Sequence, residues 1–473
     1  MTLTDLTARA LSDKISAREV SCVEVMEAAL DRIAAVNGPI NAIVSLRPAE
    51  DLLAEAAEAD AALADGATPG PLFGMPIAVK DLANVAGLPT SRGSPITAND
   101  IAAEDDVAIA RMRAAGAIFI GKTNTPEFGL GSHTFNPVHG ATRNPYGLDR
   151  TAGGSSGGAG AALAARMQWV CDGSDAMGSL RNPAGWNAVY GFRPSWGRIP
   201  PDAGGDVVMH PLSTLGPMAR DVDDLAMLMD VMGGPDPRAP FGPAPETYAG
   251  RLDADLTGRR IAWLGDWGGA WPMEDGVLET CEAALSALSD AGCVIETPTP
   301  PFPAEDLWHS WTTLRSFSVI GRQGVYYDDP ATRDQLRDVA VWEVERGLAL
   351  APRDILRASA IRSRWHAAAA DFFARYDAYV VPSAQCFPFP VDWKYPETLA
   401  GRTMDTYHRW MECVIPASLG GLPALGAPAG FNDAGLPIGV QIVGRYGGDM
   451  GVLQLGQAWE KAHDWAARRP PDP

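Results

Sequence analysis

The sequence lacks any long hydrophobic run, any cluster of basic residues and any closely spaced pair of cysteines. Its 473 residues carry a formal net charge of −20 at pH 7. Nucleic acids and anionic membranes are polyanions that would be repelled by such a chain, so we expect neither as a partner. No apolar stretch approaches the roughly 20 residues that a membrane-spanning helix needs.

The cysteines and histidines show no metal-ligand spacing. The six cysteines are Cys22, Cys171, Cys281, Cys293, Cys386 and Cys413. Because none forms a CxxC pair and the seven histidines contain no HExxH pattern, we expect no metal and no cofactor. Free thiols are typical of a reducing compartment. Residues 1–21 include acidic side chains and no uninterrupted apolar core, which argues against a signal peptide. We therefore expect a cytoplasmic protein.

The apolar pattern predicts helices first and alternating strands and helices afterwards. Residues 4–36 are interpreted as two amphipathic helices, and 48–64 as an Ala/Glu-rich helix that Pro48 can start. Strand-like runs follow, with a helix-like stretch at 105–115 between the first two: 76–79, 117–120, 261–264, 293–295 and 378–381. Loops and surface connections are predicted for the Gly- and Pro-rich segments 121–160, 233–249 and 384–396. This alternation predicts an α/β layered fold.

Two loops of small residues and one lysine are the candidates for chemistry. Residues 153–160 read GGSSGGAG and run into the Ala-rich stretch 161–166. Backbone N–H groups at such a helix start suit an anion or a developing negative charge. A second loop of small residues occupies 172–181. Lys80 directly follows an apolar strand, where burial would lower its pKa and leave a neutral amine.

Residues 116–123 match the phosphate-loop pattern GxxxxGK[ST]. The four middle positions are apolar and typical of a strand, whereas a phosphate cradle needs a flexible loop that is followed by a helix. Here the segment 124–126, Asn-Thr-Pro, follows. Nucleotide binding is therefore disfavoured.

Residues 154–158 also match GxSxG, the nucleophile elbow of α/β-hydrolases, with Ser156 as the nucleophile. That elbow must follow a buried strand, but 144–152 is a polar loop with Pro and Gly. It also needs a late histidine, and none of the candidates lies in a distinctive loop: His309, His366, His408 and His463. An esterase of this type is kept as an alternative.

Residues 74–200 closely resemble the amidase signature family. The hallmark segments are GMPIAVKD (74–81), GKTNTPEF (121–128), GGSSGG (153–158), GSDAMGSLR (173–181) and GFRP (191–194). Further likeness at 373–383 and 421–444 extends the resemblance over nearly the whole chain, with 235–370 the weakest part. Ser155 and Ser179 stand 24 residues apart, which is typical of the family.

The resemblance implies an α/β amidase signature fold, with a large central mixed twisted β-sheet covered by α-helices on both faces. It implies one domain, 1–473. Its parts would be N-terminal helices (1–65), a signature core (about 70–210), a specificity region (about 235–370) and the C-terminal part of the sheet (371–473).

The resemblance also implies roles for individual residues. Ser179 would be the nucleophile, Ser155 the proton bridge after a cis peptide bond, and Lys80 the neutral general base. The oxyanion hole would consist of the backbone N–H groups of Ala176, Met177, Gly178 and Ser179. Supporting roles would fall to Ser156, Asp175 and Arg181. A substrate pocket is expected along Phe128, Gly129, Leu130 and Ser132.

Two positions depart from the family pattern. Met177 stands where most relatives have glycine, so either its side chain turns away or it narrows one wall of the acyl pocket. Asn182 stands where a second arginine would suit a carboxylate-bearing substrate. We therefore expect altered acyl specificity and a neutral small-molecule substrate.

The predicted function is hydrolysis of carboxamide or related C–N bonds through an acyl-enzyme on Ser179. Aryl and alkyl amides and anilides are the expected substrates, with carbamates (urethanes) and esters as further candidates. A glutamine-dependent amidotransferase component that releases ammonia for a partner is the first alternative, and an inert binding protein is the second. A homodimer is left open.

Overall fold

The computed structural model describes residues 2–201, 206–209, 212–463, 465 and 468–473. Eight strands form a central mixed sheet in the order β12-β11-β13-β17-β16-β9-β10-β8. Their bounds are Val294–Glu296 (β12), Arg260–Trp263 (β11), Ala378–Pro382 (β13), Pro437–Gly444 (β17), Ala424–Phe431 (β16), Tyr190–Arg193 (β9), Thr214–Ala219 (β10) and Val170–Asp175 (β8). Strand β11 pairs in parallel with β12 and β13, and the remaining pairs are antiparallel.

A second sheet of three strands lies beside β8. It consists of β1 (Ile43–Val44), β3 (Ile118–Thr123) and β2 (Pro76–Lys80), with β3 in the middle. Side chains take the place of a backbone ladder between β2 and β8: the Ala78 N–H donates to Gln168 Oε1 (2.8 Å) and the Lys80 N–H donates to Asp172 Oδ1 (2.9 Å). The end of β2 is therefore held next to the loop that follows β8.

Helices cover both faces of the central sheet. Successive residues of a strand point to opposite faces. On β16, the side chain of Leu425 contacts Gly456 of α15 (Asp449–Ala462), whereas a Cβ on Gly426 would touch the backbone of Arg181 in α6 (Arg181–Trp186). The predicted α/β architecture, with a large mixed sheet between helical layers, is confirmed.

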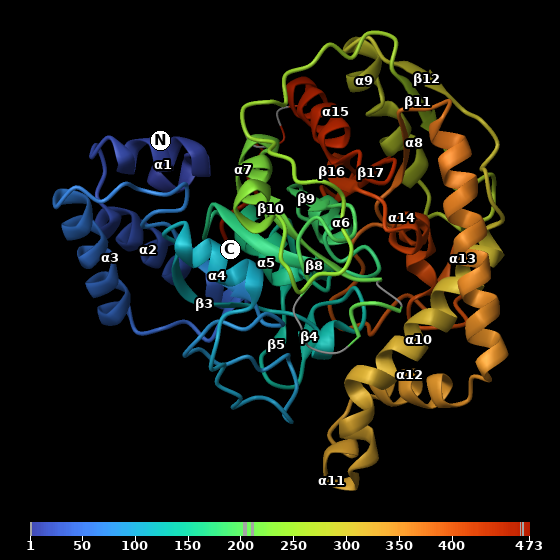
Figure 1. Cartoon of the computed structure of the whole chain (residues 1–473), viewed down its shortest axis with the longest axis horizontal. Helices are drawn as coiled ribbons and strands as arrows, with labels where there is room; N and C mark the ends of the chain where they lie inside the picture. Colours follow the sequence, from blue (N-terminus) through green and yellow to red (C-terminus); the bar gives the residue numbers. More distant parts are fainter. Residues whose placement is uncertain (1, 202–205, 210–211, 464, 466–467) are drawn as a thin grey trace.

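The other helices lie partly over the sheet, as α7 does on β10 and α8 on β16 and β17, and partly at its two sides. In Figure 1 the N-terminal helices lie at one side of the molecule and α10–α13 at the other. The bounds are Ala8–Ser16 (α1), Cys22–Ile40 (α2), Ala49–Ala64 (α3), Val107–Ala114 (α4), Gly157–Ala164 (α5), Val222–Met232 (α7), Val277–Ala283 (α8), Ser286–Asp290 (α9), Ala304–Asp328 (α10), Pro330–Arg333 (α11), Asp338–Leu348 (α12), Pro352–Phe373 (α13) and Ile415–Gly420 (α14). The helices predicted at 4–36, 48–64 and 105–115 and the five predicted strands are all present.

Two of the predicted loops differ from the structure. The segment 121–160 contains two short hairpins: β4 (Phe135–Asn136) with β5 (Gly140–Ala141), and β6 (Arg143–Asn144) with β7 (Gly147–Thr151). The surface connection expected over 384–396 is wrong for 384–389, which are buried. The reason is aromatic packing: Phe389 contacts Trp186 edge-on, and the Trp186 Nε1–H donates to the Cys386 carbonyl (3.0 Å). Segment 233–249 lies largely at the surface, as predicted.

The six cysteines are free thiols, and all are buried. Within the described part of the chain, no helix has both the length and the apolar character required to cross a membrane.

A substitution at the close contact between α6 and β17 can test how tightly the helical layer packs on the sheet. A Cβ on Gly439 would lie 2.5 Å from the Gly185 Cα and 2.5 Å from the Ala427 carbonyl oxygen, so backbone would have to move. Overpacking of this kind costs about 1–3 kcal/mol. We expect Gly439→Ala to lower the melting temperature by several degrees. The control Gly321→Ala, on α10 with no atom near its added Cβ, should leave it unchanged or raise it. Equal melting temperatures for the two variants would contradict the packing argument.

Candidate active site

Lys80 ends β2 as a fully enclosed amine. Its side chain is 1% exposed. The Nζ atom lies 2.9 Å from Ser155 Oγ, 2.8 Å from Ser156 Oγ and 3.0 Å from Ser174 Oγ. Burial lowers the pKa of Lys80 to about 7, although the carboxylates of Asp172 and Asp175 act in the opposite direction. Near neutral pH a large share of this amine is therefore unprotonated and able to accept a proton.

Ser155 and Ser156 lie on the loop that enters α5. The peptide bond between Gly154 and Ser155 is cis, as the resemblance implied. Ser156 is the residue before the first turn of α5, and its N–H donates to the Ser179 carbonyl (3.3 Å). This bond joins the 153–160 loop to the loop that carries Ser179. The sequence thus led to the residues around Lys80, except that Ser174 was in a quoted motif without an assigned role.

Ser179 lies in the turn between β8 and α6. Asp175 shapes this turn, because its carboxylate accepts the N–H groups of Gly178 (2.9 Å) and Leu180 (3.2 Å). Ser155 and Ser179 line the same cavity. Among the described residues, no hydrogen bond joins the two hydroxyl groups, so Ser179 Oγ is free to face an incoming group.

The amides around Ser179 differ in one respect from the expected oxyanion hole. Of the four N–H groups that the resemblance implied, that of Gly178 already donates to Asp175. The N–H groups of Ala176, Met177 and Ser179 have no acceptor among the described residues. Gly178 adopts φ 78°, a left-handed conformation that favours glycine, whereas Met177 does not. Met177 is buried, packs with the hydrophobic core and lines the cavity.

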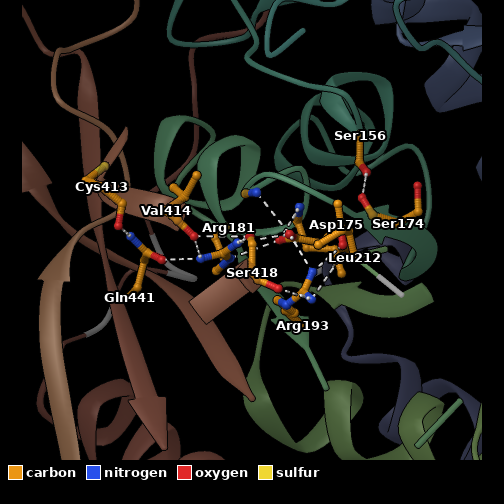
Figure 2. A network of polar contacts seen from close by, with 12 residues as sticks. Ser156, Ser174, Asp175, Arg181, Arg193, Leu212, Cys413, Val414, Ser418 and Gln441 are labelled. Atoms are coloured by element: carbon orange, nitrogen blue, oxygen red, sulfur yellow. Dashed lines mark hydrogen bonds and ion pairs between the residues drawn. The ribbon is translucent and has the colours of Figure 1, made fainter. Parts of the chain in front are cut away.

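A network of buried ion pairs involves the Asp175 carboxylate that shapes this turn (Figure 2). Arg181 donates from Nε and Nη2 to the two oxygens of Asp175, both at 2.9 Å, and Arg193 Nη1 lies 3.0 Å from Asp175 Oδ1. All three side chains are fully buried. Burial alone would raise the pKa of Asp175, but the two guanidinium groups outweigh it and hold that pKa well below its usual range.

The same network reaches the C-terminal part of the sheet. Arg181 also donates to the Val414 carbonyl (2.9 Å), to Ser418 Oγ (2.7 Å) and to Gln441 Oε1. Arg193, Ser418 and Gln441 were not predicted as site residues, although Arg193 and Gln441 fall within motifs that carried the resemblance. The arginine that ends the apolar run YGFR (190–193) is the sequence signal that could have identified Arg193, since an arginine buried in a strand needs a partner.

A small cavity of about 100 Å³ opens above Ser155 and Ser179. All four residues expected in the substrate pocket line it: Phe128, Gly129, Leu130 and Ser132. Helix α10, which lies within the predicted specificity region, supplies a further wall. Its lining residues are Trp311, Arg315, Ser318, Val319, Arg322 and Gln323.

A larger cavity of about 760 Å³ adjoins the small one. The two share Leu130, Gly131, Ser132 and Tyr407 in their linings. Aromatic side chains cover much of the larger cavity, among them Phe135, Trp342, Tyr395 and Trp410. A ligand that spans both cavities would pass Ser132 and enter the cavity that Ser155 and Ser179 line.

The structure does not support the two alternative motifs. In the phosphate-loop match, Ile118–Thr123 is the buried strand β3, and Lys122 Nζ donates to the Ala83 carbonyl and to Thr90. In the elbow match, the strand before Ser156 is β7 of a short hairpin, not a strand of the central sheet. Ser156 Oγ contacts Lys80 and the Ser174 carbonyl, and no histidine is bonded to it within the described chain. The described residues also contain no group of three or more His, Cys, Asp or Glu side chains that could hold a metal ion.

Comparison with known proteins gives the family. The family model described as Amidase matches residues 24–453 of this chain. The chain belongs to the amidase signature family. A solved bacterial aryl acylamidase of this family superposes with a TM-score of 0.90 at 26% identity, over 98% of this chain and 99% of that one. The structure of 6-aminohexanoate cyclic dimer hydrolase with substrate gives 0.88 at 28% identity, over 99% of both chains.

Two curated relatives carry different activities. The chain is 34% identical to the acylamidase of Rhodococcus erythropolis, over 99% of this chain and 97% of the relative. It is 33% identical to a glutamyl-tRNA(Gln) amidotransferase component from Moorella thermoacetica, over 99% of each. Sequence identity alone therefore does not separate an amidase from an amidotransferase component among these amidase signature proteins.

The buried ion pairs of Asp175 with Arg181 and Arg193 lead to a prediction about stability. Asp175→Asn keeps the shape of the side chain but leaves Arg181 and Arg193 buried without a counter-charge. Breaking a buried pair in this way costs about 3–5 kcal/mol. We expect a strongly lowered melting temperature at neutral pH.

The pH dependence of this loss has a defined sign. Because the folded pKa of Asp175 is lowered, its stabilisation is present above the unfolded pKa, about 3.9, and is lost as the pH falls below that value. The difference from wild type should therefore shrink in acid. The control is Asp253→Asn in the exposed pair with Lys461, where the loss should stay below about 1 kcal/mol. If Asp175→Asn were as stable as Asp253→Asn, the argument would be wrong.

Proposed function

We propose that the chain hydrolyses carboxamide and related C–N bonds through an acyl-enzyme on Ser179. The observation that carries the proposal is the buried Lys80 amine, with its pKa near 7, in contact with Ser155 Oγ beside Ser179. A serine hydroxyl is a weak nucleophile without a base, and a desolvated neutral amine is one of the few side-chain bases available without histidine.

The proposed reaction proceeds by a proton relay. Lys80 Nζ takes the proton of Ser155 Oγ while Ser155 takes the proton of Ser179, and Ser179 Oγ attacks the carbonyl carbon. The free N–H groups of Ala176, Met177 and Ser179 stabilise the oxyanion, each typically contributing on the order of 2.7–4 kcal/mol. The proton returns through Ser155 to the leaving nitrogen, because an amide nitrogen leaves poorly unless it is protonated. Water then cleaves the acyl-enzyme ester by the same relay and releases the carboxylic acid.

The two adjoining cavities support substrates with two substantial halves. The small cavity next to Ser179 fits a short group, and the aromatic lining of the larger cavity suits an aryl or alkyl group. Aryl and alkyl amides and anilides are therefore the proposed substrates, in line with the acylamidase relatives. Carbamates and esters pass through the same tetrahedral chemistry and are proposed as further substrates.

Replacement of the nucleophile gives the direct test. A panel of p-nitroanilides, alkyl amides, carbamates, esters and free glutamine is run with wild type and with Ser179→Ala. We expect wild type to cleave anilides or amides without a partner protein, and Ser179→Ala to lose at least about 10³-fold in kcat, as nucleophile removal does in other serine hydrolases. Hydroxylamine should trap the acyl group in wild type only.

The control variant for this test is Ser286→Ala, which removes an exposed hydroxyl of α9 that lines neither cavity and should leave turnover unchanged. If Ser179→Ala retained wild-type turnover on every cleaved substrate, the mechanism would be wrong. If ammonia release from glutamine were the only activity found, the amidotransferase alternative would take its place.

The pH profile tests the role of Lys80. Its pKa is lowered to about 7, and only the neutral amine accepts a proton, so kcat/KM should rise with pH through about 7 and then level off. Asp172→Asn removes a negative charge that raises the pKa of Lys80, while its side-chain oxygen can still accept the Lys80 N–H. The midpoint should therefore move to lower pH in this variant. A midpoint that stays in place, or moves upward, would assign the titration to another group.

A further inference from the structure

The small cavity above Ser179 carries charge of one sign. Its described lining includes Arg315 and Arg322 and no aspartate or glutamate. This is unusual for a chain whose net charge is −20. A cleft lined by charge of one sign concentrates its field on the ligand within it, so this cavity attracts an anion.

The two arginines differ in whether a carboxylate pairs with them. Arg315 Nε lies 2.6 Å from Glu343 Oε1, and its Nη2 donates to the Tyr407 hydroxyl (2.7 Å). The same Glu343 also acts on the charge of Arg346, so one carboxylate serves two cations. Arg322 has no ion pair and no hydrogen-bond acceptor among the described residues. Its charge is therefore available to a ligand.

Buried polar atoms without partners surround the same cavity. Gln323 Oε1, Trp311 Nε1 and Ser132 Oγ are each enclosed and have no hydrogen-bond partner in the described structure, and all three residues line the cavity. Nearly all buried polar atoms in folded proteins are hydrogen-bonded, and an unpaired one costs about 1–3 kcal/mol. Three such atoms around one cavity indicate a ligand that completes their bonds.

The donors and acceptors define the chemistry of that ligand. Arg322 and the Trp311 Nε1–H can only donate, so both need an acceptor, and the positive charge of Arg322 favours an acceptor that carries negative charge. The planar fork of a guanidinium group matches a carboxylate in particular. Gln323 Oε1 can only accept, and it fits an N–H group, which every secondary amide carries.

We propose that Arg322, together with Trp311 and Gln323, binds a carboxylate-bearing amide, with the carboxylate a few bonds from the carbonyl that Ser179 attacks. The short spacing follows from the size of the small cavity, which contains both Ser179 and Arg322. The proposal rests on the proposed function and specifies its substrate class.

Asn182, from which a neutral substrate was expected, does not face the ligand. It is 1% exposed, its Oδ1 accepts the Gly154 N–H (3.2 Å), and it is absent from the lining of either cavity. Position 182 therefore does not contact a ligand in either cavity, whereas Arg322 lines the small cavity.

Matched pairs of substrates test the proposal. The first pair places the carboxylate on the acyl half: glutaryl p-nitroanilide against 5-oxohexanoyl p-nitroanilide, in which a methyl ketone replaces the carboxylate at equal size. The second pair places it on the amine half: N-benzoyl-β-alanine against N-benzoyl-4-amino-2-butanone. The readout is the ratio of kcat/KM for the acidic member to that for the neutral member. In wild type we expect a ratio of about 10 or more for one of the pairs, because charge-assisted hydrogen bonds are worth about a tenfold change or more.

Three variants then test whether Arg322 is the residue that recognises the carboxylate. Arg322→Met should reduce the ratio of the preferred pair about tenfold, chiefly through a higher KM for the acidic member. Arg322→Lys keeps the charge without the fork and should restore part of the ratio. The control Arg357→Met removes an exposed arginine of α13 that lines neither cavity, and it should leave the ratio unchanged. Higher ionic strength should lower the wild-type ratio, which a purely structural role of Arg322 would not explain.

The outcomes separate this proposal from the proposed function. If wild type prefers the neutral member of both pairs, or if Arg322→Met leaves the ratio unchanged, the carboxylate site is wrong. The amidase proposal then still stands as long as Ser179→Ala abolishes turnover of the neutral anilide. If neither member of either pair is cleaved while other amides are cleaved by way of Ser179, acidic amides are not its substrates and the carboxylate site is again overturned.

Discussion

The burial of one lysine at the end of β2 is the constraint on which the site depends. A charged amine is poorly solvated in a protein interior, so burial favours its neutral form. Asp172 and Asp175 oppose this effect, and the balance leaves the pKa of Lys80 near neutrality. A more polar surrounding would keep the amine protonated. A surrounding without carboxylates would lower its pKa further, so that it would be a weaker base.

The position of β2 beside β8 fixes the distance between the Lys80 amine and the carboxylates that act on its pKa. The two strands lack a shared backbone ladder and are joined by the side chains of Gln168 and Asp172. The same Asp172 that bonds to the backbone of Lys80 also supplies the charge that acts on its amine. Asp175 has a comparable double role, because it shapes the turn of Ser179 and neutralises Arg181 and Arg193. Structural and electrostatic functions are therefore combined in two carboxylates.

The sequence located the residues that meet around Lys80 and Ser179 because its information there is local. Lys80, Ser155 and Ser179 occur in short motifs, each of which ends a strand or begins a helix, and a motif of a few residues determines such a turn. The four expected pocket residues, 128–130 and 132, also come from one continuous segment. The structure adds to this prediction that the Gly178 N–H is already occupied by Asp175, which depends on how a single carboxylate is oriented.

The wall formed by α10 could not be predicted in the same way. Trp311, Arg322 and Gln323 lie more than a hundred residues beyond Ser179, and their meeting with it depends on tertiary packing. No helical period distinguishes an arginine that faces a cavity from one that faces water. The buried connection 384–389 was missed for a related reason, since Pro and aromatic residues there resemble a surface loop until Trp186 packs against them.

The arrangement of α10 has a consequence for how such an enzyme can diversify. Trp311, Arg315, Ser318 and Arg322 follow one another at helical spacing, so a single stripe of one helix faces the small cavity. The groups proposed to react belong to other elements, β2 and the loops around α5 and α6. Mutations in that stripe can therefore change which compounds are accepted while the reacting groups remain in place. A library restricted to Ser318 and Arg322 would search new specificities with little loss of folded protein, whereas changes at Trp311 or Arg315 would remove buried contacts.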